Sequence, residues 1–188
     1  MKKGLLFVIS VLLVSIPGLS ADIDYSGIIN RAQALMDRLV SAKPITGCED
    51  EAAAILIDRI KELGLPYEIV LSGNPPASPL PVVSDPGGKC LDGRQPSTEK
   101  RPNIIIKLKA ASKNGPQLKP MMVVAHMDVV PAIKQVWSPG IEPHKFTEKD
   151  GFFYGRGVMD MLGYLSISLE LFGEIQKSQI PLDRDLIL

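Results

Sequence analysis

The chain has 188 residues, and its 21 Lys and Arg balance 21 Asp and Glu, so the formal net charge is zero at pH 7. Apolar residues make up 45% and charged residues 22% of the sequence, a composition typical of a globular domain that excludes a disordered chain or a fibrous repeat. The balanced charge also argues against a nucleic-acid-binding protein, because such proteins carry an excess of Lys and Arg on one face.

Residues 1–20 are typical of a secretory signal peptide. Two lysines precede an apolar run over residues 4–16, and Gly18 and Ser20 supply the small side chains required before a cleavage site at Ala21. The alternative is a membrane anchor, but an apolar helix of this length rises only about 20 Å, short of the roughly 30 Å hydrocarbon core. We therefore expect cleavage, no stable membrane anchor, and a mature protein (residues 21–188) that is periplasmic or secreted.

Two helices and a strand are predicted in the first part of the mature chain. Apolar residues recur at helical spacing over residues 25–41, and a second helix is predicted over residues 49–63. The acidic first turn of the second helix complements the helix dipole, and Gly64 provides a C-terminal cap. A strand is expected over residues 67–71. Residues 72–102, rich in Pro and Gly, are predicted to form a long surface loop or an insertion.

Further strands are predicted on both sides of a second loop, which spans residues 110–120. Residues 103–109 form one strand, and the uninterrupted apolar run MMVVA over residues 121–125 is typical of a strand buried on both faces of a parallel sheet. A short strand over residues 152–154 and a helix over residues 160–177 follow. This alternation predicts an α/β domain with a layered, mostly parallel sheet and flanking helices.

The chain has two cysteines, Cys48 and Cys90. Export would permit a disulfide between them, but the sequence does not show whether their Cα atoms approach within about 7 Å. Two unpaired thiols are the open alternative. Neither cysteine has metal-ligand spacing, so no chemistry is assigned to them.

A His-x-Asp pair follows the strand predicted over residues 121–125. In an extended chain His126 and Asp128 point to the same side, and open α/β sheets place ligand sites just beyond the carboxyl ends of their strands. His126 is therefore a candidate metal ligand that Asp128 would orient by a hydrogen bond. The alternative for His126 is a structural hydrogen bond. The other histidine, His144, is expected at the surface.

A glycine-rich turn, Gly155-Arg156-Gly157, precedes the helix predicted over residues 160–177. This arrangement suggests a dinucleotide-binding GxGxxG motif, but Asp160 stands where the third glycine would be. Its carboxylate would repel a pyrophosphate at the helix N-terminus, whereas an Asp on such a turn suits a cation. Asp160 is therefore the second candidate metal ligand.

Together, HMDVVP (126–131), Trp137 and DGFFYGRGVMDMLG (150–163) resemble the two N-terminal motifs of the M20 metallopeptidases. That family contains aminoacylases, glutamate-releasing carboxypeptidases, succinyl-diaminopimelate desuccinylases and dipeptidases. PITGCEDE (44–51) and KELGL (61–65) resemble the flanks of the second helix of the family. Leu162 departs from the family, which commonly has Lys there, but this change affects no proposed ligand.

The resemblance implies a catalytic centre with two Zn²⁺ ions, for which Co²⁺ or Mn²⁺ could substitute. His126 would bind one zinc and Asp160 would bridge both, while Asp128 would be the catalytic residue that orients His126. Imidazole nitrogen and carboxylate oxygen are suitable zinc ligands, and a two-metal site activates water for attack on an amide. The implied substrate is a small peptide or an N-acyl amino acid.

The family places its remaining groups after the segment equivalent to residue 188. These groups are a Glu-Glu pair with the general base, a further acidic ligand, a distant histidine, and a lid and dimerisation domain. We therefore expect residues 21–188 to be an N-terminal part of a zinc-peptidase-like catalytic domain that lacks the lid, is inactive alone, and forms a homodimer only in the full-length form. The alternatives are a non-catalytic exported α/β binding module, or a fragment whose site a second polypeptide completes.

Overall fold

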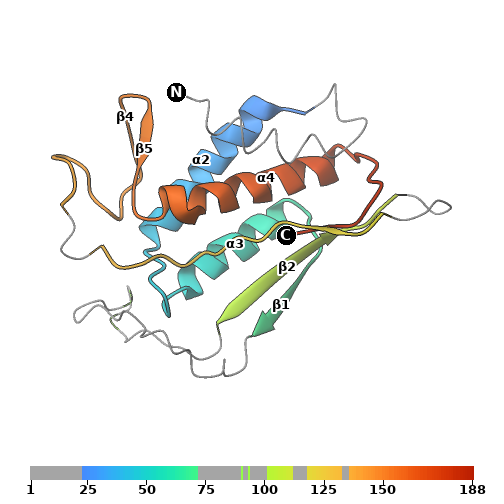
Figure 1. Ribbon diagram of the computed structural model, residues 1–188, viewed down its shortest axis with the longest axis horizontal. Coiled ribbons are helices and arrows are strands. Elements are labelled where there is room, and N and C mark those ends of the chain that lie inside the picture. The colour runs from blue at the N-terminus through green and yellow to red at the C-terminus, as the bar shows by residue number, and fades with distance from the viewer. Residues whose placement is uncertain (1–22, 72–89, 91–92, 94–100, 112–117, 133–135) are drawn as a thin grey trace.

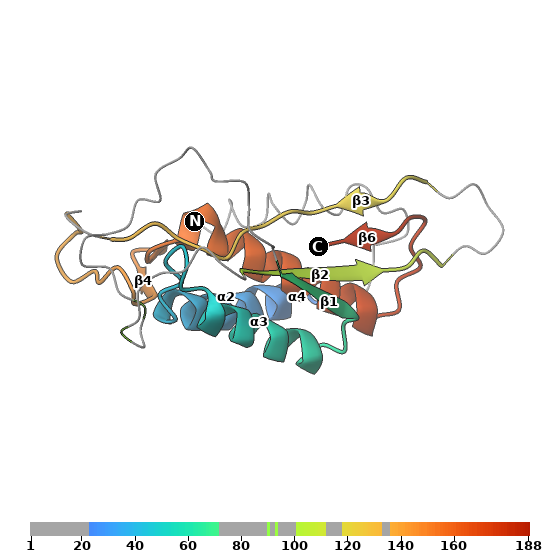
Figure 2. The ribbon, with the colours of Figure 1, turned by 90° about the horizontal axis from the view of Figure 1, so that it is seen from below.

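The computed structural model describes residues 23–71, 90, 93, 101–111, 118–132 and 136–188. The predicted signal peptide and most of the predicted loop over residues 72–102 lie outside the described residues. In the described part, three helices lie on one side of a four-stranded sheet (Figures 1 and 2). None of the helices within these residues is both long and apolar enough to cross a membrane.

Two helices begin the described chain, and both follow from local sequence signals. Helix α2 (Tyr25–Ser41) has the predicted bounds, and Asp24 caps it by accepting a hydrogen bond from the Gly27 amide at 2.8 Å. Helix α3 (Asp50–Glu62) lies within one residue of its prediction at each end, with acidic residues in its first turn and basic residues in its last. These charges complement the helix dipole.

The third helix is shorter than the sequence predicts. Helix α4 (Gly163–Lys177) begins at Gly163, whereas the prediction begins at residue 160. The preceding segment, η1 (Val158–Leu162), is an irregular turn in which Asp160 (φ −131°, ψ 95°) and Met161 (φ −137°, ψ 33°) are not helical. The helical pattern of apolar residues therefore begins before the backbone becomes regular.

The four-stranded sheet has the order β1-β2-β6-β3. Strands β1 (Tyr67–Leu71) and β2 (Pro102–Leu108) are antiparallel, β2 and β6 (Leu186–Ile187) are antiparallel, and β6 is parallel to β3 (Met121–Met122). The prediction of a layered α/β domain is confirmed, but that of a mostly parallel sheet is wrong. A parallel pair needs a crossover connection, and the chain between β3 and β6 supplies one that contains a helix, α4.

The MMVVA segment is not buried on both faces as predicted. Val123 is 6% exposed, but Met122 and Val124 are 64% and 71% exposed. This alternation arises because successive side chains point to opposite faces, and the described helices cover only one face (Figure 2). A separate hairpin of β4 (Thr147–Lys149) and β5 (Phe152–Tyr154) precedes η1; β5 has its predicted bounds, whereas β4 was not predicted.

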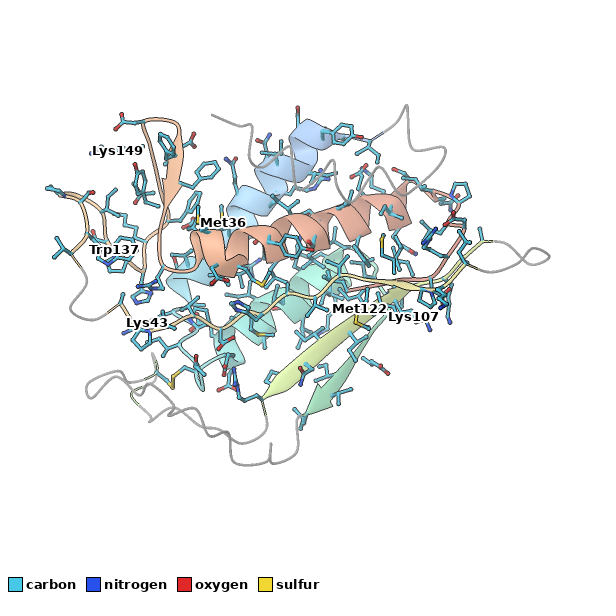
Figure 3. All side chains as sticks on the ribbon, in the orientation of Figure 1. Met36, Lys43, Lys107, Met122, Trp137 and Lys149 are labelled. Atoms are coloured by element: carbon cyan, nitrogen blue, oxygen red, sulfur yellow. A yellow bond between two sulfur atoms is a disulfide. The ribbon has the colours of Figure 1, made fainter. Side chains whose placement is uncertain are left out.

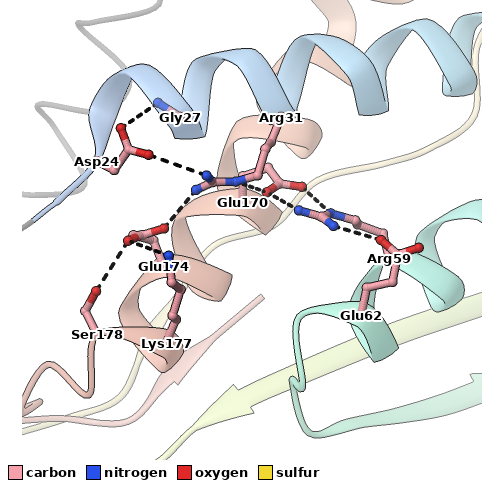
Figure 4. Close-up of polar contacts among 9 residues, drawn as sticks. All are labelled: Asp24, Gly27, Arg31, Arg59, Glu62, Glu170, Glu174, Lys177 and Ser178. Atoms are coloured by element: carbon pink, nitrogen blue, oxygen red, sulfur yellow. Dashed lines mark hydrogen bonds and ion pairs between the residues drawn. The ribbon is translucent and has the colours of Figure 1, made fainter.

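A cluster of buried charges joins the three helices (Figure 4). Glu170 of α4 has a fully buried side chain and accepts hydrogen bonds from Arg31 of α2 (3.1 Å) and from Arg59 of α3 (2.6 and 2.8 Å). Arg31 also donates to Glu174, one turn further along α4, at 2.8 Å. The hydrogen bond to Glu170 raises the pKa of the Arg59 guanidinium. The helix packing therefore depends on charge pairs that the apolar pattern of α4 did not reveal.

We predict that Glu170→Gln lowers the free energy of unfolding by about 3 kcal/mol or more, because it leaves two partly buried arginines facing a neutral amide. The matched control is Glu62→Gln, which removes the other carboxylate bound to Arg59 (2.8 Å), a side chain that is 57% exposed. This control should cost less than about 1 kcal/mol. Urea unfolding of both variants measures the difference, and equal losses would contradict a special role for the buried pair.

Candidate metal centre

The candidate metal ligands come from two segments that meet next to Gly157. His126 and Asp128 lie on the extended chain after β3, and Asp160 lies in η1. Gly157 has a positive φ of 85°, and a Cβ atom there would lie 2.5 Å from Cγ1 of Val129. Only glycine combines this conformation with so close an approach. Its absence of a side chain therefore lets the turn that carries Asp160 pack against the segment that carries His126.

Asp128 and Asp160 each lie within contact distance of His126. His126 Nε2 is 3.1 Å from Asp160 Oδ1, and His126 Nδ1 is 3.0 Å from the backbone oxygen and 3.5 Å from Oδ1 of Asp128. The side chains of His126 and Asp160 are 48% and 85% exposed. Asp128 therefore lies next to Nδ1 of the imidazole and Asp160 next to Nε2. Their role as metal ligands stays a prediction.

The hydrogen-bond geometry of His126 fits a bound cation. A backbone carbonyl only accepts, so we assign the imidazole proton to Nδ1, which faces the oxygen of Asp128. In the neutral ring, the lone pair of Nε2 then faces a carboxylate oxygen 3.1 Å away. Two acceptors at this distance need a cation between them, either a proton on the ring or a metal ion. Two atoms bound to one tetrahedral zinc lie about 3.3 Å apart, close to the observed separation.

The described residues do not form a complete metal site. They gather no group of three or more His, Cys, Asp or Glu side chains that could hold an ion. The pair of His126 and Asp160 is therefore the described portion of the candidate centre, and the exposure of both side chains leaves room for further ligands.

Residues 44–49 run beside the candidate centre. Ile45 forms a one-residue parallel bridge with Val129, and Cys48 is disulfide-bonded to Cys90, with Cα atoms 5.3 Å apart. Of the two alternatives left open by the sequence, the structure thus contains the disulfide. Closing a loop of this sequence separation, 42 residues, is worth about 4 kcal/mol in the chain-entropy model. The covalent link therefore restrains the segment that borders His126 and Asp128.

His144, expected at the surface, is only partly exposed. Its Nδ1 is buried without a hydrogen-bond partner among the residues that the structure describes. Burial, together with the positive charges of Lys43 and Arg156, lowers the pKa of His144 to about 4. The Arg156 guanidinium stacks over the Trp137 ring at 5.6 Å, and Lys43 and Trp137 lie toward the same end of the molecule in Figure 3. His144 is thus held as a neutral ring by its surroundings.

The segment that contains all three site residues is similar to known proteins. Residues 122–188 match Peptidase family M20/M25/M40. The N-fatty-acyl-amino acid synthase/hydrolase PM20D1 of Bos taurus is 42% identical over 57 residues, 30% of this chain and 11% of the relative. Acetylornithine deacetylase of Vibrio campbellii is 39% identical over 59 residues (31% and 15%). Succinyl-diaminopimelate desuccinylase of Zymomonas mobilis is 28% identical over 127 residues (68% and 26%).

Solved structures share the fold. Human carnosine dipeptidase 1 aligns with a TM-score of 0.59 at 18% identity over 86% of this chain and 32% of its own. Aminopeptidase PepT of Bacillus cereus aligns with a TM-score of 0.50 at 21% identity over 85% and 35%. The matches thus span 11–26% of the curated relatives named above and about a third of these two structures. Residues 122–188 thus match Peptidase family M20/M25/M40, which confirms the resemblance found in the motifs.

We predict that His144 destabilises the fold in acid. Its pKa is about 4 in the folded chain and 6.5 in its ordinary state, so protonation favours unfolding, and the stabilising contribution is lost as the pH falls from 6.5 to 4. Partial exposure screens the charges, so we expect a loss of about 1 to 2 kcal/mol. The unfolding free energy of the wild type, measured from pH 7 to 4.5, should fall by this much more than that of His144→Gln. Parallel curves would contradict the prediction.

Proposed function

We propose that the chain is part of a zinc-dependent hydrolase that cleaves an amide bond, and that His126 and Asp160 bind the metal. The observation that carries the proposal is the 3.1 Å approach of His126 Nε2 to Asp160 Oδ1. It occurs within residues 122–188, which match Peptidase family M20/M25/M40. Two acceptor atoms directed at each other support a shared cation more directly than either motif does.

Each described residue has a definite part in this proposal. His126 binds the ion through Nε2 and keeps its proton on Nδ1, facing Asp128. Asp160, with 85% of its side chain exposed, would bind another ion through its second oxygen, as a bridging carboxylate requires. When bound, a pair of zinc ions would lower the pKa of a water molecule and polarise the amide carbonyl. In this proposal, the general base and the remaining metal ligands are residues other than His126, Asp128 and Asp160.

We further propose an N-acylated amino acid as the substrate class, with a small peptide as the alternative. The names of PM20D1, acetylornithine deacetylase and succinyl-diaminopimelate desuccinylase each denote action on an N-acylated amino acid or its derivative. The signal peptide predicted over residues 1–20 would place this reaction outside the cytoplasm. Hydrolysis of N-acetyl amino acids and of dipeptides by the protein, as its host expresses it, separates the two substrate classes.

We predict that His126→Ala and Asp160→Ala each weaken zinc binding by at least tenfold, about the smallest cost reported for the loss of even an outer-shell partner. Titration of the purified chain with Zn²⁺ against a chromophoric chelator measures the affinity. Glu148→Gln, an exposed acidic residue of the β4–β5 hairpin, is the control for loss of a negative charge and should leave the affinity unchanged. Unaltered zinc binding in both alanine variants would favour the non-catalytic binding module instead.

A further inference from the structure

The carboxylate of Asp128 is held from the side opposite His126. Thr46 Oγ1 donates a hydrogen bond to Asp128 Oδ2 at 2.8 Å, and Nη2 of Arg101 lies 3.3 Å from the same oxygen. The other oxygen, Oδ1, is the one that lies 3.5 Å from His126 Nδ1. One oxygen of Asp128 therefore contacts Thr46 and Arg101, and the other faces the imidazole of His126.

The backbone around Thr46 has little freedom to move away from Asp128. The Val129 amide donates to the Pro44 carbonyl at 2.8 Å, and the Thr46 amide donates to the Val129 carbonyl at 3.2 Å. These bonds fix the chain on both sides of Thr46 directly next to Asp128. The same segment therefore restrains both acceptors that face His126 Nδ1: the Asp128 carbonyl through the backbone bridge, and the Asp128 carboxylate through the Thr46 hydroxyl.

Arg101 is held in place by a buried carboxylate. Its Nη2 forms an ion pair with Oε1 of Glu49, a residue that is 4% exposed, and the same Oε1 accepts a hydrogen bond from the Gly47 amide at 3.0 Å. A buried carboxylate needs an ion pair and hydrogen bonds of this kind to offset the cost of its removal from water. Glu49, Arg101 and Asp128 therefore form a continuous chain of ionic contacts that ends at the imidazole of His126.

We propose that Thr46 is a positioning residue of the metal centre. Together with Arg101, it binds one oxygen of Asp128 and so directs the other at His126 Nδ1, which keeps the ring proton on Nδ1 and turns Nε2 toward Asp160. A histidine ligand needs its second nitrogen occupied in this way, because that hydrogen bond sets both the tautomer and the ring orientation. The inference rests on the proposed function of His126 and Asp160 as metal ligands.

The test compares Thr46→Val, which keeps the branched shape but removes the donor, with Thr46→Ser, which keeps the hydroxyl. Thr46→Val should weaken Zn²⁺ binding by about tenfold, and Thr46→Ser should stay within about threefold of the wild type. The matched control is Thr147→Val, since that hydroxyl donates to the Lys145 carbonyl at 3.3 Å on the exposed hairpin. It should leave zinc binding unchanged.

A spectroscopic measurement separates positioning from a general effect on folding. In the metal-free protein, the ¹⁵N shifts of the His126 ring should report a single Nδ1–H tautomer in the wild type and in Thr46→Ser, and a mixture in Thr46→Val. A wild-type tautomer and wild-type affinity in Thr46→Val would overturn the inference, as would equal losses in the Ser and Val variants. If circular dichroism shows that Thr46→Val is unfolded, Thr46→Ala replaces it with the same expectations.

A double-mutant cycle tests whether Thr46 acts through Asp128. In an Asp128→Asn background, Thr46→Val should change the zinc affinity by less than about twofold, because the carboxylate that it holds is gone. The same tenfold loss in both backgrounds would overturn the inference. If the wild type binds no zinc but Thr46→Val still loses the single tautomer, the positioning role stands and the proposed function fails.

Discussion

The buried carboxylate of Glu170 is the constraint that the helical layer depends on. An ionised group removed from water must be paired on nearly all of its hydrogen-bonding positions, and Glu170 obtains its partners from Arg31 of α2 and Arg59 of α3. An apolar contact tolerates sliding and rotation of one helix against another, but hydrogen bonds to two guanidinium groups from different helices do not. Glu170 therefore selects one arrangement of the three helices, and with it the position at which α4 begins.

The start of α4 matters because the candidate metal centre is built immediately before it. The turn of η1 presents Asp160 to His126, and Gly157 permits this turn to lie against Val129 without a side chain between them. The helix layer thus holds one half of the centre, and the extended chain after β3 holds the other. A displacement of α4 along its axis would separate His126 Nε2 from Asp160 Oδ1, since neither side chain is buried among packed neighbours.

The match to Peptidase family M20/M25/M40 covers residues 122–188, and the residues that support the centre extend beyond them. Thr46 contacts Asp128 across 82 positions of sequence, and Arg101 reaches the same oxygen from the start of the segment that forms β2. The disulfide between Cys48 and Cys90 restrains the part of the chain that carries Thr46. The proposed site is therefore a product of three distant segments, of which the family match over residues 122–188 contains one.

Local signals in the sequence determined the bounds of α2, β1 and β5 and identified His126, Asp128 and Asp160 as the candidate site, because capping, periodicity and motif spacing act over a few neighbouring residues. The sequence did not determine strand direction, the exposure of Val124, or the Cys48–Cys90 pairing. These depend on which distant segments meet: β2 and β6 run antiparallel, and the described helices cover one face of the sheet. The contact of Thr46 with Asp128 could not be predicted from the sequence either, because only the tertiary structure brings the two segments together.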